Sequence, residues 1–386
     1  MVGRGKIFSP PFWSLSREQQ NQHLEAPRSP GTAEIRLILG HRPEGAPKAE
    51  SRNLPLSESF DVHLIQVSHR IQGGPIQVSI KCLRRASAFG LLLLAQSLTA
   101  AAQARVEKNV IYGMYSGTAL LLDVHYPARQ NGFGIVFIPG SGWSAPLSYS
   151  ATPLKESPQV AMYVPSLTEA GYTVFAITHR ATPTFRYPAA VEDVQRAVRF
   201  VRHNAARYGI NPARIGGSGG SSGGHLVSLL GTMDGAGDPN DPDPVNRESA
   251  KLQCAVGRAA PADLSQMSPS NGLAAVSLFL GVAANQPMQK NSTEYKTAWA
   301  ASPINYVSPD DPPFLLVHGD ADLVVPFRQS EMMEAALKEA GVPVKLIRIE
   351  GGGHGPTFDG AKNPPDYKAE IVKWLDTHLR KAAAGQ

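Results

Sequence analysis

Cysteine is scarce in this chain of 386 residues, which contains only Cys82 and Cys254. Cys82 lies in a segment that we expect to be removed, so one thiol remains and the mature chain cannot form an intrachain disulfide. This excludes a fold held together by disulfide bonds. Cys254 falls in the short apolar stretch 252–256 and is interpreted as a small core residue rather than a reactive thiol.

Charge is also limited, and the body of the chain has no excess of either sign. Charged residues make up 18% of the sequence and apolar residues 42%, which is typical of a globular domain with additional sequence. Residues 1–104 contain 12 Lys and Arg against 7 Asp and Glu, and this accounts for the whole formal charge of +5. Residues 105–386 contain 25 of each sign. The body therefore gives no electrostatic argument for binding nucleic acid, and we expect none as a partner.

The apolar core of residues 86–94 is too short to cross a membrane. It follows the basic residues of segment 81–85 and precedes the sequence Ala-Gln-Ala at 102–104. A positive region, a short apolar core and a cleavage site of small residues form the pattern of a secretory signal peptide. We therefore predict a signal peptide over residues 80–104, a periplasmic or secreted location and no stable membrane anchor. An internal amphipathic helix is the alternative interpretation.

Residues 1–79 carry scattered Pro, Gly, Ser and Arg without a sustained hydrophobic period. This composition predicts a disordered segment. Because a signal peptide normally opens a chain, these residues are alternatively translation upstream of the true start.

From residue 105 onward, predicted strands alternate with predicted helices, which implies an α/β fold with a mostly parallel sheet covered on both faces. The expected strands are 110–115 and 119–126 as an antiparallel hairpin, then 134–138, 172–178, a strand opening at Ala213, 253–259, 314–317 and 344–349. The expected helices are 159–170, 189–208, one beginning near Leu226, 326–340 and 366–381.

Two stretches interrupt this alternation. Residues 234–250 form an acidic, Pro-rich segment that does not match the spacing of a calcium-binding EF-hand loop, so we interpret it as a solvated loop and predict no metal. Residues 261–312 lack a clear strand and are interpreted as a small cap-like insertion over the site, within a catalytic domain of residues 105–386.

The run 216–224 (Gly-Gly-Ser-Gly-Gly-Ser-Ser-Gly-Gly) joins a predicted buried strand to an apolar helix. It fits the pattern G-x-S-x-G in three registers, centred on Ser218, Ser221 and Ser222. Ser218 arrives before the strand has crossed the sheet, whereas Ser221 leads directly into the helix, whose N-terminus favours negative charge. We therefore predict that Ser221 is a nucleophile, with Ser222 as the second choice. A flexible glycine-serine linker is the competing interpretation.

An activated serine needs a base, and the base needs a carboxylate that orients it. Asp322 follows the apolar strand 314–317 and precedes a helix, at the edge of the sheet where such folds place ligands. Asp320 is the alternative carboxylate, although its position suits a turn. His354 lies on a glycine-rich loop after the last strand and is the predicted base.

Three other histidines compete for the role of base. His225 opens the helix after the serine and is interpreted as a buried packing residue. His318 ends a strand and is interpreted as structural, and His179 precedes the nucleophile in the chain.

The loop 139–143 (Pro-Gly-Ser-Gly-Trp) directly follows the strand 134–138. Backbone N–H groups of Ser141, Gly142 and Trp143, together with that of Ser222, are predicted to bind a developing oxyanion or the substrate. Losing one such donor typically costs about 10²–10³ in rate. A plain glycine turn is the alternative.

These pieces resemble the α/β-hydrolase superfamily, and within it the acetyl esterase and feruloyl esterase-like carboxylesterases, over residues 108–381. The matching motifs are Leu-Asp-Val at 122–124, the loop 139–143, Pro-Ala-Ala-Val-Glu-Asp-Val at 188–194, the serine turn through Leu226, and the loops that carry Asp322 and His354. The resemblance implies the nucleophile at Ser221, the acid at Asp322 and the base at His354. One departure is that the family loop often reads His-Gly-Gly-Gly-Trp.

The function implied is a secreted serine esterase that hydrolyses carboxylic esters through a covalent acyl-enzyme, without a cofactor. The substrate would be a small-molecule or polysaccharide-linked ester. A peptidase of the prolyl-oligopeptidase type shares the serine turn but usually carries a large preceding β-propeller, for which this chain has no room. A non-catalytic, ligand-binding hydrolase fold is the third hypothesis, and the intact Ser221, Asp322 and His354 argue against it. Nothing in the sequence specifies an oligomeric state.

Overall fold

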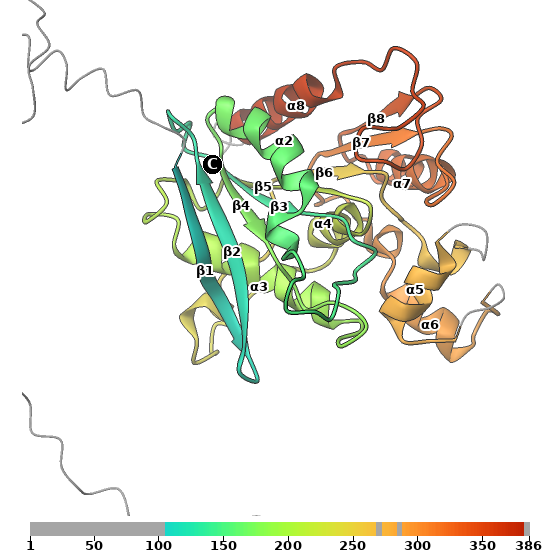
Figure 1. Cartoon of the computed structure of the whole chain (residues 1–386), viewed down its shortest axis with the longest axis horizontal. Helices are drawn as coiled ribbons and strands as arrows, with labels where there is room; N and C mark the ends of the chain where they lie inside the picture. The colour runs from blue at the N-terminus through green and yellow to red at the C-terminus, as the bar shows by residue number, and fades with distance from the viewer. Residues whose placement is uncertain (1–104, 268–271, 284–287, 382–386) are drawn as a thin grey trace, which may run out of the picture. The chain divides into compact units, whose positions relative to one another are not determined.

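The computed structural model describes residues 105–267, 272–283 and 288–381. The predicted signal peptide and residues 1–79 lie outside the described residues, so their interpretation stays a prediction. Within the described part, one eight-stranded sheet has the order β1-β2-β4-β3-β5-β6-β7-β8. In this sheet β2 runs antiparallel to the other strands, which confirms the predicted α/β fold with a mostly parallel sheet (Figure 1).

The predicted elements are present with small shifts of their ends. The strands are β1 Arg105–Tyr115, β2 Thr118–Tyr126, β3 Gly134–Ile138, β4 Thr173–Ile177, β5 Ile215–Gly220, β6 Cys254–Arg258, β7 Phe314–Gly319 and β8 Val344–Ile349. The α-helices are α2 Pro158–Glu169, α3 Ala189–His203, α4 Ser222–Thr232, α5 Leu273–Leu280, α6 Thr293–Ala300, α7 Arg328–Glu339 and α8 Tyr367–Lys381.

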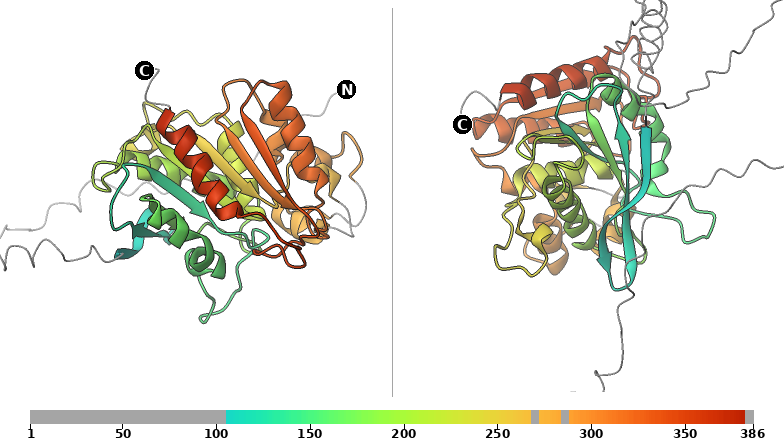
Figure 2. Two further views of the ribbon diagram at one scale, coloured as in Figure 1. Left: turned by 90° about the horizontal axis from the view of Figure 1, so that it is seen from above. Right: turned by 90° about the vertical axis from the view of Figure 1, so that its left-hand side faces the viewer.

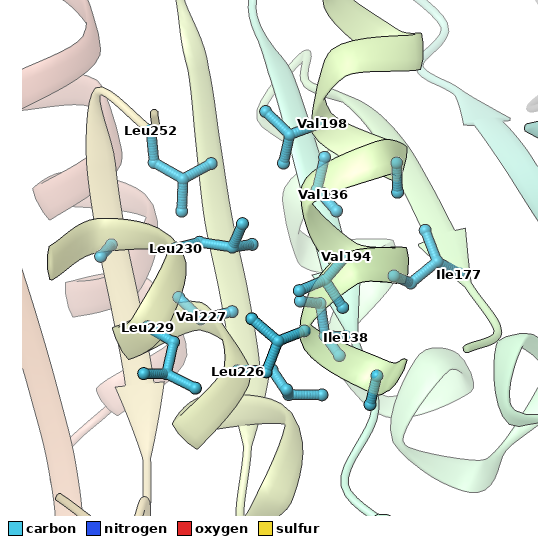
Figure 3. Close-up of a cluster of buried hydrophobic side chains, with 14 of the residues drawn as sticks. Val136, Ile138, Ile177, Val194, Val198, Leu226, Val227, Leu229, Leu230 and Leu252 are labelled. Atoms are coloured by element: carbon cyan, nitrogen blue, oxygen red, sulfur yellow. The ribbon is translucent and has the colours of Figure 1, made fainter. Parts of the chain in front are cut away.

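Helices cover both faces of the sheet (Figure 2). On one face, α3 and α4 pack on β3 and β4 through aliphatic side chains, as Figure 3 shows. Val136 and Ile138 come from β3 in this cluster, and Val194 comes from α3. On the other face, α2 and α8 pack on the sheet through a second cluster. Because fully burying one such side chain is worth about 1.5–3 kcal/mol, these two clusters supply the main favourable term in folding.

The predicted helix 189–208 is too long, because α3 ends at His203. The backbone leaves the helical conformation at Asn204, whose side-chain Nδ2 donates a hydrogen bond of 2.8 Å to the carbonyl oxygen of Phe200. Asparagine competes well for backbone carbonyls and is a poor helix former. The spacing of apolar residues continues to Tyr208, which is buried although it lies in a turn after the helix. This spacing alone cannot distinguish a buried turn residue from a buried helix residue.

The helix after the serine turn begins earlier than its apolar pattern. It starts at Ser222, four residues before Leu226, so its first turn is Ser-Gly-Gly-His. The two glycines of this turn are needed where the helix lies against the sheet. A Cβ atom on Gly224 would come within 2.9 Å of the Cβ of Ala260.

Two carboxylates in the motifs that carry the family resemblance form buried ion pairs. Oδ1 of Asp123 lies 2.9 Å from Nζ of Lys155, and Oδ1 of Asp193 lies 2.7 Å from Nη2 of Arg180. The second pair fixes the segment after β4, where the backbone N–H of Thr182 donates to the carbonyl oxygen of Trp143 at 2.8 Å. These carboxylates are therefore structural, and the second anchors the loop 139–143 beside the serine turn.

Candidate active site

Ser221 occupies a strained bend between β5 and α4. Its backbone has φ 53° and ψ −126°, a region that residues other than glycine rarely adopt. Its backbone N–H donates to the carbonyl oxygen of Arg258 on the neighbouring strand at 2.7 Å, which anchors the bend in the sheet. This conformation places the side chain of Ser221 at the carboxyl ends of the parallel strands.

Close backbone contacts explain why the register centred on Ser221 is the one that forms the bend. A Cβ atom on Gly219 would lie 2.6 Å from the carbonyl carbon and oxygen of Gly223, and one on Gly223 would lie 2.0 Å from the carbonyl oxygen of Ile138. Both glycines of this register thus face main-chain atoms that cannot move aside. The other two candidates are buried, Ser218 within β5 and Ser222 at the start of α4.

Ser221, His354 and Asp322 form a continuous hydrogen-bonded chain. The Oγ of Ser221 lies 2.9 Å from Nε2 of His354, and Nδ1 of His354 lies 2.7 Å from Oδ2 of Asp322. Because an ionised carboxylate only accepts hydrogen bonds, Nδ1 carries the proton and Nε2 accepts from the serine hydroxyl. Three residues separated by up to 133 positions in the sequence are therefore brought together in the order that nucleophilic catalysis requires.

Asp322 is buried and fully hydrogen-bonded. Its Oδ1 accepts from the backbone N–H groups of Val324 and Val325 at 2.8 and 2.9 Å, and its Oδ2 accepts from His318 at 3.2 Å as well as from His354. Burial alone would raise the pKa of Asp322, but the hydrogen bonds from the two histidines outweigh it and hold that pKa well below its usual value. The carboxylate of Asp322 is thus ionised at neutral pH.

The competing residues have structural partners. Asp320 pairs with Arg348 at 2.7 Å and accepts from the backbone N–H of Gly351, as a turn residue does. His225 is fully buried, accepts from Trp143 Nε1 at 3.2 Å and lies 2.7 Å from the carbonyl oxygen of Ala301. Burial lowers the pKa of His225 to about 4, so it is neutral at physiological pH.

His179 and His318 are also buried, and neither lines the cavity above Ser221. His318 bridges Ser330 Oγ and Asp322, so it supports the predicted acid rather than replacing His354. This second histidine on the carboxylate has no signal in the sequence beyond its spacing of four residues from Asp322.

The loop 139–143 approaches the bend through its backbone. The N–H of Ser141 donates to Ser222 Oγ at 2.9 Å, and Gly142 lines the cavity above Ser221. Trp143 is buried and does not line that cavity, and its indole ring stacks on Phe279 with 4.5 Å between the ring centroids. The side chains of Ser222 and Trp143 therefore hold the loop in place, and neither residue is among the described residues that line the cavity.

A cavity of about 370 Å³ opens above Ser221, with His354 on its wall. Two of its lining residues, Gln159 from the first turn of α2 and Arg258 from the end of β6, were absent from the residues predicted from the sequence. A charged residue that ends an otherwise apolar strand was the available signal for Arg258. A larger cleft of about 800 Å³ lies beside α3, where Arg196 pairs with Asp243 at 2.7 Å. None of the three residues predicted as nucleophile, base and acid lines it.

The family model named BD-FAE matches residues 122–337, which is more than half of the chain. The chain belongs to the BD-FAE family. The match covers the predicted nucleophile and acid and ends before His354.

Curated relatives of this BD-FAE chain include two proteins of Mycobacterium tuberculosis. Esterase LipQ is 31% identical over 54% of this chain and 46% of its own length. The probable carboxylic ester hydrolase LipM is 32% identical over 58% of this chain and 49% of its own length. The chain thus spans about half the length of these two relatives.

Two solved structures of esterases have a similar fold. A truncated carbohydrate esterase from gut microbiota aligns with a TM-score of 0.60 at 29% identity, over 73% of this chain and 99% of the other. An acetyl ester-xyloside bifunctional hydrolase from Caldicellulosiruptor lactoaceticus aligns with a TM-score of 0.56 at 25% identity, over 73% and 97%. These similarities confirm the α/β-hydrolase fold and the resemblance to carboxylesterases.

The cap-like insertion of this BD-FAE chain contains α5 and α6, which lie together in Figure 1. It contacts the loop 139–143 through Phe279, whereas the described residues that line the cavity above Ser221 come from outside the insertion. Its role as a cap stays a prediction. Across residues 105–381, apart from the two undescribed gaps, no helix is both long and apolar enough to cross a membrane, and no cluster of three potential metal ligands is present.

Proposed function

We propose that this BD-FAE chain is a secreted serine esterase that hydrolyses carboxylic esters through an acyl-enzyme. The observation that carries the proposal is the hydrogen-bonded chain from Ser221 through His354 to Asp322, with distances of 2.9 and 2.7 Å. The esterases among its relatives support the reaction class, and the Ala-Gln-Ala sequence at 102–104 supports export.

In the proposed mechanism, Ser221 Oγ attacks the ester carbonyl while His354 Nε2 accepts the hydroxyl proton. The ionised Asp322 stabilises the resulting imidazolium through its hydrogen bond to Nδ1. His354 then donates this proton to the leaving alcohol, and the acyl group remains on Ser221. A water molecule gives its proton to His354 and attacks the acyl-enzyme, which releases the acid and restores the serine hydroxyl.

Backbone N–H groups of Gly142 and Ser222 are the proposed donors to the oxyanion. Gly142 lines the cavity, and Ser222 is the first residue of α4, where a helix leaves its amide groups without intrahelical partners. The N–H of Ser141, which was also predicted as a donor, is already bonded to Ser222 Oγ. The helix N-terminus adds a favourable field for negative charge at this point.

Acetylated carbohydrates are the proposed substrate class, because the named structural neighbours act on carbohydrate and acetyl esters. The test is hydrolysis of p-nitrophenyl acetate, methyl ferulate and acetylated xylan by the wild type and by Ser221→Ala. We expect the variant to lose at least about 10³ of the rate. Ser218→Ala is the matched control, because it removes a hydroxyl from the same run of residues and that side chain is buried in β5. Turnover of a peptide p-nitroanilide without any ester turnover would replace the proposal by the peptidase alternative.

Export is tested separately by expressing the full chain in a bacterial host. N-terminal sequencing of the exported protein should begin at Arg105. A product that stays in the cytoplasm and retains residues 1–79 would contradict the proposed location and leave the proposed chemistry standing.

A further inference from the structure

Arg258 is a buried cation on the wall of the cavity that contains Ser221. It is the last residue of β6, and its side chain lies in register with Gly220, the residue before Ser221. Only 3% of its surface is exposed, yet it lines the same cavity as Ser221 and His354. An arginine retains its positive charge in proteins, although burial lowers the pKa of Arg258 from its usual value.

The guanidinium of Arg258 has few partners for a group with five N–H donors. One face of the guanidinium stacks on the ring of Tyr163, with Cζ 3.5 Å from the ring centroid. Its Nη2 donates a hydrogen bond of 3.3 Å to Oε1 of Gln159. Its Nε is buried without a hydrogen-bond partner among the described residues. No Asp or Glu carboxylate of the residues that the structure describes lies within ion-pair distance of the Arg258 guanidinium.

Lys155 and Arg180, the other buried Lys and Arg side chains among the described residues, show what is missing. Lys155 has the carboxylate of Asp123 at 2.9 Å, and Arg180 has that of Asp193 at 2.7 Å. Burial of an unpaired charge is costly, so proteins normally supply a counter-ion. Arg258 departs from this pattern on the wall of the cavity that contains Ser221 and His354.

The guanidinium also lies beside Gly220, the residue before the predicted nucleophile. A Cβ atom on Gly220 would lie 2.7 Å from Nη2 and 2.9 Å from Cζ of Arg258, so the absence of a side chain at Gly220 makes room for the cation. Gln159, which accepts from Arg258, also contacts the backbone of Gly140 in the predicted oxyanion loop. A group a few bonds from the scissile carbonyl therefore lies within reach of the cation.

We propose that Arg258 determines specificity by binding a carboxylate on the acid or alcohol part of the ester. A guanidinium matches a carboxylate through two parallel N–H···O bonds, and the anion would supply the counter-ion that the protein does not. The inference rests on the proposed function and adds a substrate class to it, esters that carry a second, ionised carboxyl group.

Two pairs of esters test it, each with an anionic member and a neutral one in which an isopropyl group replaces the carboxylate. Monomethyl succinate and methyl 4-methylpentanoate place the difference on the acid. O-acetylglycolate and isobutyl acetate place it on the alcohol. Hydrolysis is followed by alkali uptake at constant pH. We expect the wild type to prefer the anionic member of one pair, and the pair in which it does so identifies the side of the ester that faces Arg258.

Arg258→Met should lower kcat/KM for the preferred anionic ester about 10- to 100-fold more than for its neutral partner, as the loss of a charge-assisted bidentate contact predicts. Arg258→Lys should fall between, because it keeps the charge and loses the planar fork. Arg207→Met is the control, since Arg207 is half-exposed and pairs with Glu107 away from the cavity. A wild type without preference for either anion, or equal losses for both members of a pair, would overturn the inference and leave Arg258 a support for Gln159.

A binding measurement separates this inference from the proposed reaction. Calorimetry with the Ser221→Ala variant should detect binding of the preferred anionic ester, and Ser221→Ala/Arg258→Met should bind it at least about 10-fold more weakly. This readout needs no turnover. If the wild type hydrolysed no ester, the proposed function would fail, while equal affinities of the two variants would overturn the role of Arg258.

Discussion

Gly223→Ala is the substitution for which the structure makes the sharpest prediction. Gly223 is the second glycine of the serine turn, and an added Cβ atom would lie 2.0 Å from the carbonyl oxygen of Ile138 and 2.8 Å from the carbonyl carbon of Pro139. Both obstacles belong to the main chain, one at the end of β3 and one in the predicted oxyanion loop. No change of rotamer can therefore relieve the contact.

The magnitude follows from the size of this overlap. Cβ atoms in proteins essentially never come closer than 3.0 Å to another heavy atom. The contact at 2.0 Å therefore requires α4 or β3 to shift by at least about 1 Å. Overpacking that side chains can accommodate costs about 1–3 kcal/mol, and we expect at least about 3 kcal/mol here because backbone has to move. A shift of about 1 Å at a reacting group costs on the order of 10² in rate, so the folded fraction should also lose activity.

The assay is urea unfolding together with ester turnover, and Gly257→Ala provides the matched control. Gly257 is a buried strand glycine near the same helix, but an added Cβ atom there has its closest contacts at 3.6 Å, which is ordinary packing. Its stability should stay within about 1 kcal/mol of the wild type. Equal urea midpoints and equal activities for the two variants would refute the close-approach argument for the serine turn.

Three further predictions concern buried charge, acid stability and the coupling of the triad. Asp193→Ala should cost about 3–5 kcal/mol in thermal or urea unfolding because it leaves Arg180 buried without its carboxylate, and a loss below about 1 kcal/mol would contradict the pairing. As the pH falls from 6.5 to 4, the free energy of unfolding of the wild type should fall by about 3 kcal/mol more than that of His225→Gln. The reason is that the imidazole binds a proton in the unfolded chain over this range, whereas the buried imidazole, with its pKa of about 4, does not. Parallel curves of unfolding free energy against pH for the two proteins would exclude this. Finally, Ser221→Ala/His354→Ala should be about as inactive as either single variant, because the residues act as a unit, whereas additive losses in kcat would remove His354 from the mechanism.

The sheet could be predicted from the sequence because its central strands are continuous apolar runs between turn residues. β3 and β4 are buried along their whole length and are recognisable for that reason. β5 has only one apolar residue, Ile215, and the glycine run that follows marked it instead. The end of α3 could not be placed, because the burial of Tyr208 continues the helical period after the helix has stopped.

The three residues of the proposed triad were predictable because each follows a strand, and parallel strands end at one edge of the sheet. Their neighbours were not predictable in the same way. Gln159 reaches the cavity from the first turn of α2, and this depends on how that helix packs on the sheet. The direction of the Trp143 ring is decided by Phe279, which lies 136 positions away in the sequence. Such contacts leave no local periodicity to detect.

The central claim is that Ser221 is the activated nucleophile, and covalent labelling with a fluorophosphonate tests it most directly. Fragmentation of the labelled peptide by mass spectrometry should find one adduct, on Ser221. The label should disappear in Ser221→Ala and slow strongly in His354→Ala, which lacks the base 2.9 Å from the hydroxyl. An adduct on Ser222, or no adduct on the folded wild-type protein, would contradict the account.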